Sequence, residues 1–237
     1  MDIVYIIGKN CSKCNNNELR YSLRSIEKYG KNVGKVYVAG YCPEWLSDEV
    51  IKVPFEQPYS HPDIIEKHIN RLSTTLFVVD NTDISDEFLI SMDDHFYIKE
   101  TDFNNYPYYA KIVKGSTDLG AKNSLSRYGR FILNTGKFLK SLNLPTYYFC
   151  LHRNMHLSKK IINECRDTLN RIIKNKIECE ELAFILNYWV NKEHFNITPV
   201  KDIKIKLVKD WNKVNPDNTE VFSTSDFESG SKLDILI

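Results

Sequence analysis

The chain has 237 residues, with 32 Lys and Arg against 31 Asp and Glu and a formal net charge of +1 at pH 7. This length suits one medium-sized domain, and 42% hydrophobic with 27% charged residues argue against a disordered chain. Proteins that hold nucleic acid through its phosphates usually carry a clear basic excess. The charge balance therefore disfavours a nucleic-acid partner.

The N-terminal residues bear on the cellular compartment and, through it, on the state of the cysteines. Asp2 and the short apolar run 3–7 do not make a signal peptide, and no stretch approaches the roughly 18 to 20 apolar residues that span a bilayer. We therefore expect a cytoplasmic protein whose six cysteines stay as thiols. Cys11 and Cys14 form a CxxC pair, and a zinc or dithiol site is one interpretation. No second pair follows, so a plain loop fits better.

Strand and helix patterns alternate in the first hundred residues. β-branched and aromatic runs that end at Gly or Pro predict strands, and Leu19, Leu23 and Ile26 recur at helical spacing. In chain order we expect a strand over 2–8, a polar loop over 9–17, a helix ended by Gly30, a strand over 36–39, a turn or short helix at 43–46, a strand over 51–53, a helix over 63–72 beside Pro62, and a strand over 88–92.

The pattern beyond residue 100 is less regular. The run 180–191 is apolar and rich in aromatic residues, which predicts a core helix. Glu180 and Glu181 precede that run and are interpreted as charges at a helix N-terminus, not as an acid–base pair. We further expect strands over 108–113 and 201–208 and helices over 130–142 and 159–173.

This order of elements predicts an α/β fold with parallel central strands. In such sheets ligands collect at the carboxyl ends of the strands. The polar loop after the first strand and the sequence Asp93-Asp94-His95 after the fourth strand both belong at that edge.

Asp93 and Asp94 lie between two apolar runs, so neither carboxylate can solvate freely if both runs are core. A divalent cation would compensate for this, and oxygen ligands suit Mg²⁺ or Mn²⁺. If the ion also met a diphosphate, it could stabilise a departing nucleotide. The alternative is a solvated β-turn, and the pattern alone leaves both open.

Three parts of the sequence resemble conserved blocks of the Stealth family, sugar-phosphate transferases of capsule synthesis. They are Asn16-Asn-Glu-Leu-Arg-Tyr-Ser-Leu-Arg-Ser-Ile-Glu-Lys-Tyr29, Lys35–Val38 with Pro43–Leu46, and Ile90-Ser-Met-Asp-Asp-His-Phe96. The wider resemblance is to GT-A glycosyltransferases, whose acidic motif binds a metal and the nucleotide diphosphate. It implies one α/β domain with a GT-A-like, mainly parallel sheet flanked by helices. Residues 1–100 would form the donor half and residues 101–237 the acceptor and C-terminal half.

The resemblance also implies roles for residues near the acidic pair. Asp93 and Asp94 would hold Mn²⁺ or Mg²⁺ with help from His95, and Asp94 would take part in catalysis. Arg20 would contact a donor phosphate, a role that suits a bidentate guanidinium, with Asn17 beside it. The alternative for this helix is that Glu18, Arg24 and Glu27 simply solvate its outer face.

Further candidates follow from the same resemblance. Lys67, Asn70 and Arg71 would border the donor, with exposed helix charges as the alternative. The stretch 147–157 resembles a Tyr-x-x-His-x-Pro block in which His152 would ligate the metal or act in catalysis, while His156 competes for that role. The run 222–226 resembles a closing Ser-Thr-x-Asp element. Its Asp226 would meet the sugar or the metal, unless the run is an ordinary turn.

We therefore expect a metal-dependent glycosyltransferase that moves a sugar from a nucleotide-sugar donor to a glycan or lipid-linked acceptor in surface polysaccharide synthesis. One alternative is the Stealth reaction, transfer of a sugar 1-phosphate. Another is a non-catalytic module that only binds sugar or nucleotide. A metal-dependent nuclease would need a basic groove that the net charge does not suggest. A lipid-linked acceptor would make peripheral contact with the inner membrane face compatible with this function.

Overall fold

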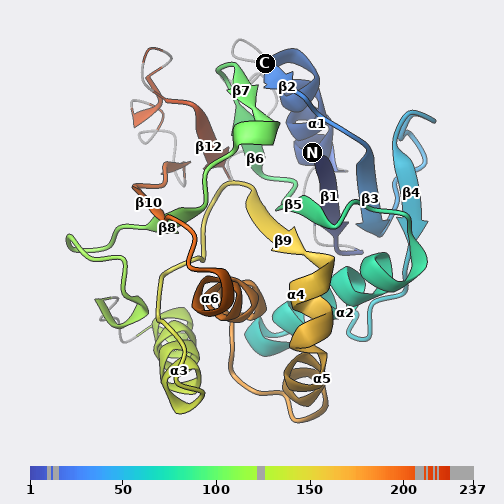
Figure 1. Ribbon diagram of the computed structural model, residues 1–237. Helices are drawn as coiled ribbons and strands as arrows, with labels where there is room; N and C mark the ends of the chain where they lie inside the picture. The colour runs from blue at the N-terminus through green and yellow to red at the C-terminus, as the bar shows by residue number, and fades with distance from the viewer. Residues whose placement is uncertain are drawn as a thin grey trace.

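The centre of the fold is a five-stranded sheet with the strand order β4-β3-β1-β5-β9 (Figure 1). This computed structural model describes residues 1–9, 12, 16–121, 126–205, 211, 213–215, 217 and 219–224. Its elements are β1 (Asp2–Ile7), α1 (Asn17–Tyr29), β2 (Gly30–Lys31), β3 (Val36–Gly40), β4 (Ile51–Pro54), α2 (Ile64–Asn81), β5 (Glu87–Ser91), β6 (His95–Tyr97), β7 (Thr101–Asp102), η1 (Phe103–Asn105), β8 (Tyr109–Lys111), η2 (Leu119–Ala121), α3 (Arg127–Ser141), β9 (Met155–Ser158), α4 (Lys159–Glu164), α5 (Arg166–Lys174), α6 (Glu181–Glu193), β10 (Thr198–Val200), β11 (Lys204–Ile205) and β12 (Val221–Thr224).

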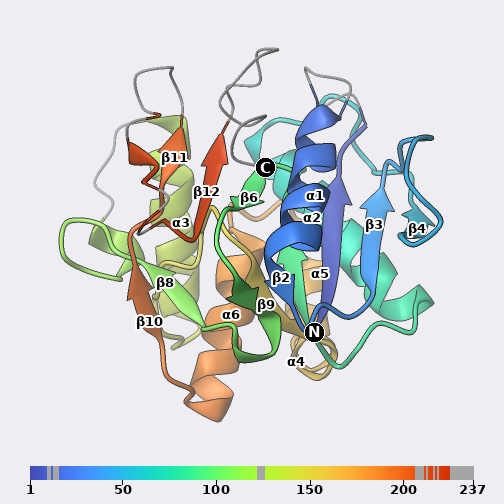
Figure 2. The ribbon, with the colours of Figure 1, turned by 90° about the horizontal axis from the view of Figure 1, so that it is seen from above.

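Four strands of the central sheet run parallel. β1 pairs with β3 and β5, and β3 pairs with β4, all in parallel register, while β9 pairs antiparallel with β5. The carboxyl ends of β1, β3, β4 and β5 therefore lie along one edge of the sheet, which Figure 2 shows for the β1 and β3 arrows. Because β9 runs the other way, its first residue, Met155, lies beside Ile90 near the end of β5.

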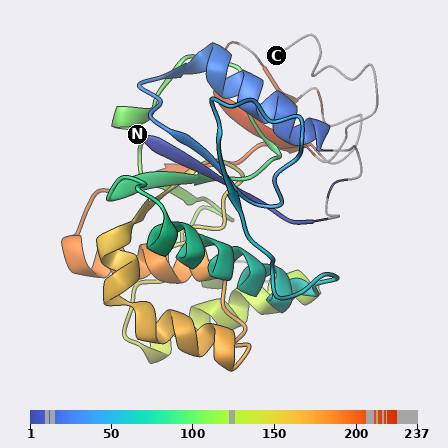
Figure 3. The same ribbon diagram turned by 90° about the vertical axis from the view of Figure 1, so that its right-hand side faces the viewer.

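The residues of β1 alternate between two buried layers, as a strand covered on both faces requires. Val4 and Ile6 contribute to a large core with α2 to α6, whereas Ile3, Tyr5 and Ile7 pack in a second core with α1. Figure 3 shows α1 on one side of the sheet and the later helices on the other. The described chain is thus one mixed α/β domain with a mainly parallel central sheet, as the order of elements predicts.

Local sequence signals set the ends of the first two helices. α1 ends where the N–H of Gly30 donates to the carbonyl of Ile26. Asp63 accepts hydrogen bonds from the first turn of α2, and the side chain of Glu66 accepts the N–H of Asp63, which completes a capping box. α2 is nevertheless longer than the predicted 63–72, because Leu76, Val78 and Val79 pack in the core and tertiary packing overrides their local preferences.

Other differences lie in the second half of the chain. The predicted helix 159–173 is interrupted at Cys165, which separates α4 from α5. β9 was not expected, and neither were the short strands β2, β6, β7, β10 and β12 of the small sheets β10-β8, β11-β12-β6 and β2-β7. The predicted strand 108–113 is confirmed as β8. Of 201–208 the structure describes residues up to 205, with β11 within them. Among the described residues, no helix has the length and apolar character needed to cross a membrane.

Candidate functional site

The acidic pair lies at the carboxyl edge of the central sheet. Asp93 and Asp94 form the turn between β5, whose Phe88, Leu89 and Ile90 are buried, and the fully buried β6. The two apolar runs that flank the pair are thus both core, which meets the condition that the sequence analysis sets. Because β5 neighbours β1 on one side and β9 on the other, the turn lies between the ends of these strands.

Asp93 has a second acidic neighbour besides Asp94. Glu18, in the first turn of α1, is 7% exposed, and its Oε2 has no hydrogen-bond partner among the described residues. Burial, together with the negative charges of Asp94 and Glu18, raises the pKa of Asp93 to about 7. One interpretation of the sequence leaves Glu18 on a solvated helix face. The structure corrects this, because Glu18 is buried and α1 packs against β6, where the hydroxyl of Ser22 donates to the His95 carbonyl.

Asp94 is half-buried and has two basic neighbours. Its Oδ1 lies 3.7 Å from Nε2 of His95, and its Oδ2 lies 3.5 Å from Nζ of Lys204 in β11. His95 is 1% exposed and its Nδ1 accepts the N–H of Met92 at 3.4 Å. This hydrogen bond assigns the proton of the neutral ring to Nε2, which has no hydrogen-bond partner among the described residues. Burial lowers the pKa of His95, against the opposing charges of Asp94 and Asp202.

A cavity of about 270 Å³ adjoins Asp94 and brings together five of the residues that the sequence predicts for the site. They are Lys67 and Arg71 from α2, Asp94 and His95 from the acidic turn, and His152 from the segment before β9. The remaining lining residues are His68, Met92, Tyr128, Cys150, Leu151, Met155 and Glu180.

Arg71 is held by two buried carboxylates. Its Nε donates to Glu181 and its Nη2 donates to Glu180, while Nδ1 of His68 lies 2.8 Å from Oε2 of Glu181. Burial opposes ionisation of Glu181, but the positive charges of Arg71 and His68 hold its pKa at about 2. Glu180 also caps α6 by accepting the N–H of Ala183. Glu180 and Glu181 thus lie at the N-terminus of a helix, as the sequence predicts. Their burial against Arg71 was not expected.

The group His68, Glu180 and Glu181 could also hold a metal, since their ligand atoms lie within 4.8 Å of one another. The guanidinium of Arg71 already supplies a cation to both carboxylates. A metal ion at this group would have to displace that guanidinium from a buried position.

A larger cavity of about 690 Å³ lies at the ends of β1, β3 and β4. Asn70 lines it, but its side chain is used within the fold: Oδ1 accepts the N–H of Tyr59 and Nδ2 donates to the Tyr59 carbonyl. Asn70 thus shapes this wall, while Lys67 and Arg71 face the smaller cavity. The other lining residues are Lys9, Gly40, Tyr41, Cys42, Pro54, Phe55, Glu56, Gln57, Tyr59, Ser60 and Pro62.

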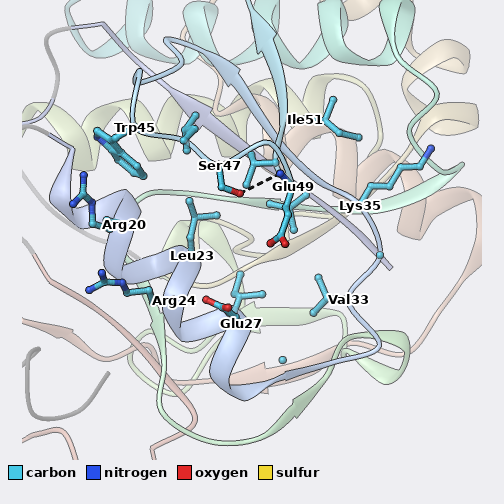
Figure 4. A pocket seen from close by; sticks show the side chains of 16 residues that line it. Arg20, Leu23, Arg24, Glu27, Val33, Lys35, Trp45, Ser47, Glu49 and Ile51 are labelled. Carbon is cyan, nitrogen blue, oxygen red and sulfur yellow. Dashed lines mark hydrogen bonds between the residues drawn. The ribbon is translucent and has the colours of Figure 1, made fainter.

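Arg20 lies in neither of these cavities. Its guanidinium carbon lies 4.4 Å from the ring centre of Trp45, and both residues line a groove of about 730 Å³ between α1 and the connection from β3 to β4 (Figure 4). Arg24, Glu27 and Glu49 line the same groove. Asn17, the first residue of α1, is exposed and lines none of the three cavities. The structure therefore does not bring Arg20 or Asn17 into the cavity beside Asp94.

The two competing histidines have different surroundings. His152 lines the small cavity, and its backbone N–H donates to Oδ2 of the buried Asp202 at 3.0 Å. His156 is 4% exposed in β9, and its Nε2 donates to the Tyr106 carbonyl at 2.6 Å. Because β9 is a strand, the two rings are not one helical turn apart, and His152 alone of the two lines this cavity.

Some of the predicted site residues lie outside the described residues. Asp226 lies outside them, and so do Cys11 and Cys14. Of the run 222–226, Phe222, Ser223 and Thr224 are buried within β12, so this part is a strand and not a turn. Glu18 and Lys204 are the site neighbours that the sequence did not reveal.

No protein-family model matches the chain, and no curated protein shows significant sequence similarity to it.

Proposed function

We propose that this protein is a metal-dependent transferase that uses a nucleotide-sugar donor and a glycan or lipid-linked acceptor. One observation carries the proposal: the acidic pair follows β5 at the carboxyl edge of a mainly parallel sheet, where Asp94 lines the smaller cavity and the larger cavity lies at the ends of β1, β3 and β4. Ligands of open α/β sheets bind at this edge. The larger cavity would take the nucleoside, and the diphosphate would lie at Asp93 and Asp94.

The side chains at the acidic turn have the donor atoms that a divalent cation prefers. Glu18, Asp93 and Asp94 offer carboxylate oxygens, the donors that Mn²⁺ and Mg²⁺ prefer, and the buried Oε2 of Glu18 has no hydrogen-bond partner among the described residues. Asp93 and Asp94 would hold the ion. When bound, such an ion supplies positive charge that stabilises the departing nucleoside diphosphate.

The remaining roles belong to the protein's own groups. Lys204, whose Nζ lies 3.5 Å from Asp94, would supply positive charge to the diphosphate end of the donor. His152 faces the same cavity and is positioned there through the hydrogen bond of its backbone to Asp202. Arg71 is held by Glu180 and Glu181, so its role is to shape the cavity wall.

The resemblance to the Stealth family supports the same function class. Its longest block coincides with α1, whose Glu18 approaches the acidic turn, and its last block contains that turn. The resemblance equally implies transfer of a sugar 1-phosphate, and a binding module would share the same residues. A lipid-linked acceptor would bring the protein to the inner face of a membrane.

A donor-hydrolysis screen tests the proposal. The wild-type protein is incubated with uridine, guanosine, cytidine and adenosine nucleotide sugars, with and without Mn²⁺, and the products are analysed. Mn²⁺-dependent release of free sugar supports glycosyl transfer, and release of sugar phosphate supports the Stealth-type reaction. If the nucleotide sugar binds equally well with and without Mn²⁺ and no product forms, the enzyme assignment is overturned in favour of a binding module.

A further inference from the structure

The positive charges of this near-neutral chain are unevenly distributed along the sequence. The chain carries 32 basic and 31 acidic residues, yet residues 119–163 contain eight Lys or Arg and neither Asp nor Glu. The eight are Lys122, Arg127, Arg130, Lys137, Lys140, Arg153, Lys159 and Lys160. Half of them lie on α3, which has no acidic residue of its own. α3 therefore carries charge of one sign only.

The basic side chains of α3 lie mainly on its solvent side. The opposite side is buried, with Phe131, Ile132 and Leu139 in the large core. The solvent side is formed by residues at spacings of three and four, which places them in one stripe along the helix. We call this stripe the outer face of α3, and it consists of Arg130, Leu133, Asn134, Lys137, Lys140 and Ser141. Its three basic residues are exposed, and Figure 1 shows α3 at the margin of the domain.

Acidic groups of the protein offset only part of this charge. Arg127, at the start of the helix, forms an ion pair with Asp63. Glu178 accepts a hydrogen bond from the side chain of Asn134 and so brings one negative charge to the outer face. Lys137 and Lys140 form no ion pair with the residues that the structure describes. The outer face therefore keeps an excess of positive charge.

We infer that the outer face of α3 adsorbs to an anionic lipid bilayer. A row of exposed Lys and Arg is complementary to the negative surface potential of such a bilayer. Helices that lie on membranes also carry apolar and aromatic side chains at the border of their basic face. On α3 these are Leu133 and Phe138, which are half-buried, and Tyr128, which is 39% exposed. Because the apolar side of α3 is already buried in the core, the contact is electrostatic and needs no insertion of the helix.

The shape of this surface favours a bilayer over a nucleic acid. Single-stranded nucleic acid is held in a basic groove lined with aromatic side chains. Arg130, Lys137 and Lys140 line none of the cavities and grooves described above, since they lie on the convex side of a helix. A bilayer is planar and can meet such a helix along its whole length. The charge and the shape of the outer face thus point to the same partner.

Adsorption through α3 would bring the candidate site close to the membrane. The helix has 15 residues and is therefore about 22 Å long. Tyr128, in its first turn, lines the cavity beside Asp94. That cavity consequently opens at one end of the helix that meets the bilayer, where a lipid-linked acceptor would enter it. This last consequence rests on the proposed function, whereas the bilayer contact does not.

Vesicle cosedimentation of the full chain tests the inference. Vesicles of phosphatidylcholine alone are compared with vesicles that also contain about 30% phosphatidylglycerol, at about 50 mM and about 300 mM NaCl. We expect binding to the anionic vesicles only, weakened at least about tenfold at the higher salt concentration. Equal binding to both kinds of vesicle would overturn the electrostatic contact.

The location is tested with a double variant, Lys137→Gln with Lys140→Gln. Each Lys near an anionic surface contributes about fivefold to binding, so we expect the double variant to bind anionic vesicles about tenfold to thirtyfold more weakly. The matched control is Lys28→Gln with Lys52→Gln, which changes the net charge equally. Lys28 and Lys52 are exposed on α1 and β4, and Figure 3 shows α1 on the other side of the sheet. The control should stay within about twofold of wild type, and equal losses in both double variants would overturn the location.

Two further measurements separate this inference from its rivals. If a labelled RNA oligonucleotide binds and depends on Lys137 and Lys140 while anionic vesicles do not bind, the partner is a nucleic acid and the inference is overturned. Nucleoside diphosphate binding with Mn²⁺ is measured on the same preparation. Nucleotide binding without vesicle binding overturns the bilayer contact alone. Vesicle binding without nucleotide binding supports the bilayer contact and overturns the proposed function.

Discussion

Nζ of Lys204 lies 3.5 Å from Oδ2 of Asp94, so an ammonium group of the protein lies beside the predicted metal ligand. The side chains of Lys204 and Asp94 are 28% and 25% exposed. A partly exposed ion pair of this kind contributes at most about 1 kcal/mol. Lys204 therefore partly neutralises Asp94 and competes weakly with a bound cation.

Lys204→Met should consequently raise the affinity for Mn²⁺ alone by about threefold to fivefold, because a competing positive charge is removed. Calorimetric titration with MnCl₂ at low salt measures this change. Lys201→Met is the control, since Lys201 is exposed three residues before Lys204 and forms no ion pair with the described residues of the acidic turn. A lower Mn²⁺ affinity in Lys204→Met would contradict a metal site at Asp94.

Glu181→Gln separates the two groups that could hold a metal. The substitution leaves the buried Arg71 with one carboxylate fewer, so we expect the free energy of unfolding to fall by about 3 kcal/mol. Mn²⁺ affinity should stay at the wild-type value, because Glu181 is not part of the acidic pair. Urea unfolding and Mn²⁺ titration of the same preparation provide both values. Loss of Mn²⁺ binding with little loss of stability would instead place the ion at His68, Glu180 and Glu181.

His156 predicts a pH dependence of stability. Burial lowers its pKa from 6.5 to about 4, so the folded state binds its proton more weakly than the unfolded state does. The contribution of neutral His156 to the free energy of unfolding is fully present above about pH 6.5 and is lost as the pH falls through about 4. It amounts to about 3 kcal/mol, at 1.36 kcal/mol per unit of pKa.

His156→Gln removes this titration and can still donate to the Tyr106 carbonyl, which His156 bonds through Nε2. Urea unfolding of wild type and variant is compared at pH 7.5, 5.5 and 4. We expect the stability of wild type relative to the variant to fall by about 3 kcal/mol over this range. A constant difference would show that His156 does not titrate with folding.

Gly40 ends β3 at the edge of the larger cavity and has φ +91°. A Cβ at this position would contact the Ile7 carbonyl oxygen closely, so Gly40→Ala combines backbone strain with a clash. We expect a loss of about 2–3 kcal/mol in urea unfolding. Gly115→Ala is the matched control, with φ +80° and no atom within 4 Å of its Cβ. Gly115→Ala should lower the free energy of unfolding by about 1 kcal/mol. Equal losses in Gly40→Ala and Gly115→Ala would rule out the clash at Gly40.

The first half of the fold is predictable because its signals are local. The β-branched and aromatic run of β1, the helical spacing before Gly30 and Pro62 beside the start of α2 each act within a few residues. β9 is different, because Met155–Ser158 is four residues long and exists through its pairing with β5. The extension of α2 to Asn81 likewise depends on packing against the sheet, which no local preference contains.

The candidate site likewise has a part that local sequence signals predict and a part that depends on packing between distant segments. The position of Asp93 and Asp94 follows from the end of a predicted strand, and the structure brings Asp94, His95, Lys67, Arg71 and His152 to one cavity. The burial of Glu18 and the approach of Lys204 depend on how distant segments pack, so the sequence does not contain them. Arg20 lies on the predicted helix, but its guanidinium stacks on Trp45 and therefore points into a different groove from the cavity beside Asp94.

The most direct test of the account is nucleoside diphosphate binding with Mn²⁺ to wild type and Asp94→Asn. The control is Asp48→Asn, which removes a fully exposed carboxylate. Calorimetry should show Mn²⁺-dependent binding to wild type and Asp48→Asn, and at least about tenfold weaker binding to Asp94→Asn. If Asp94→Asn binds Mn²⁺ and nucleotide as wild type does, the acidic pair is not the metal centre and the account is contradicted.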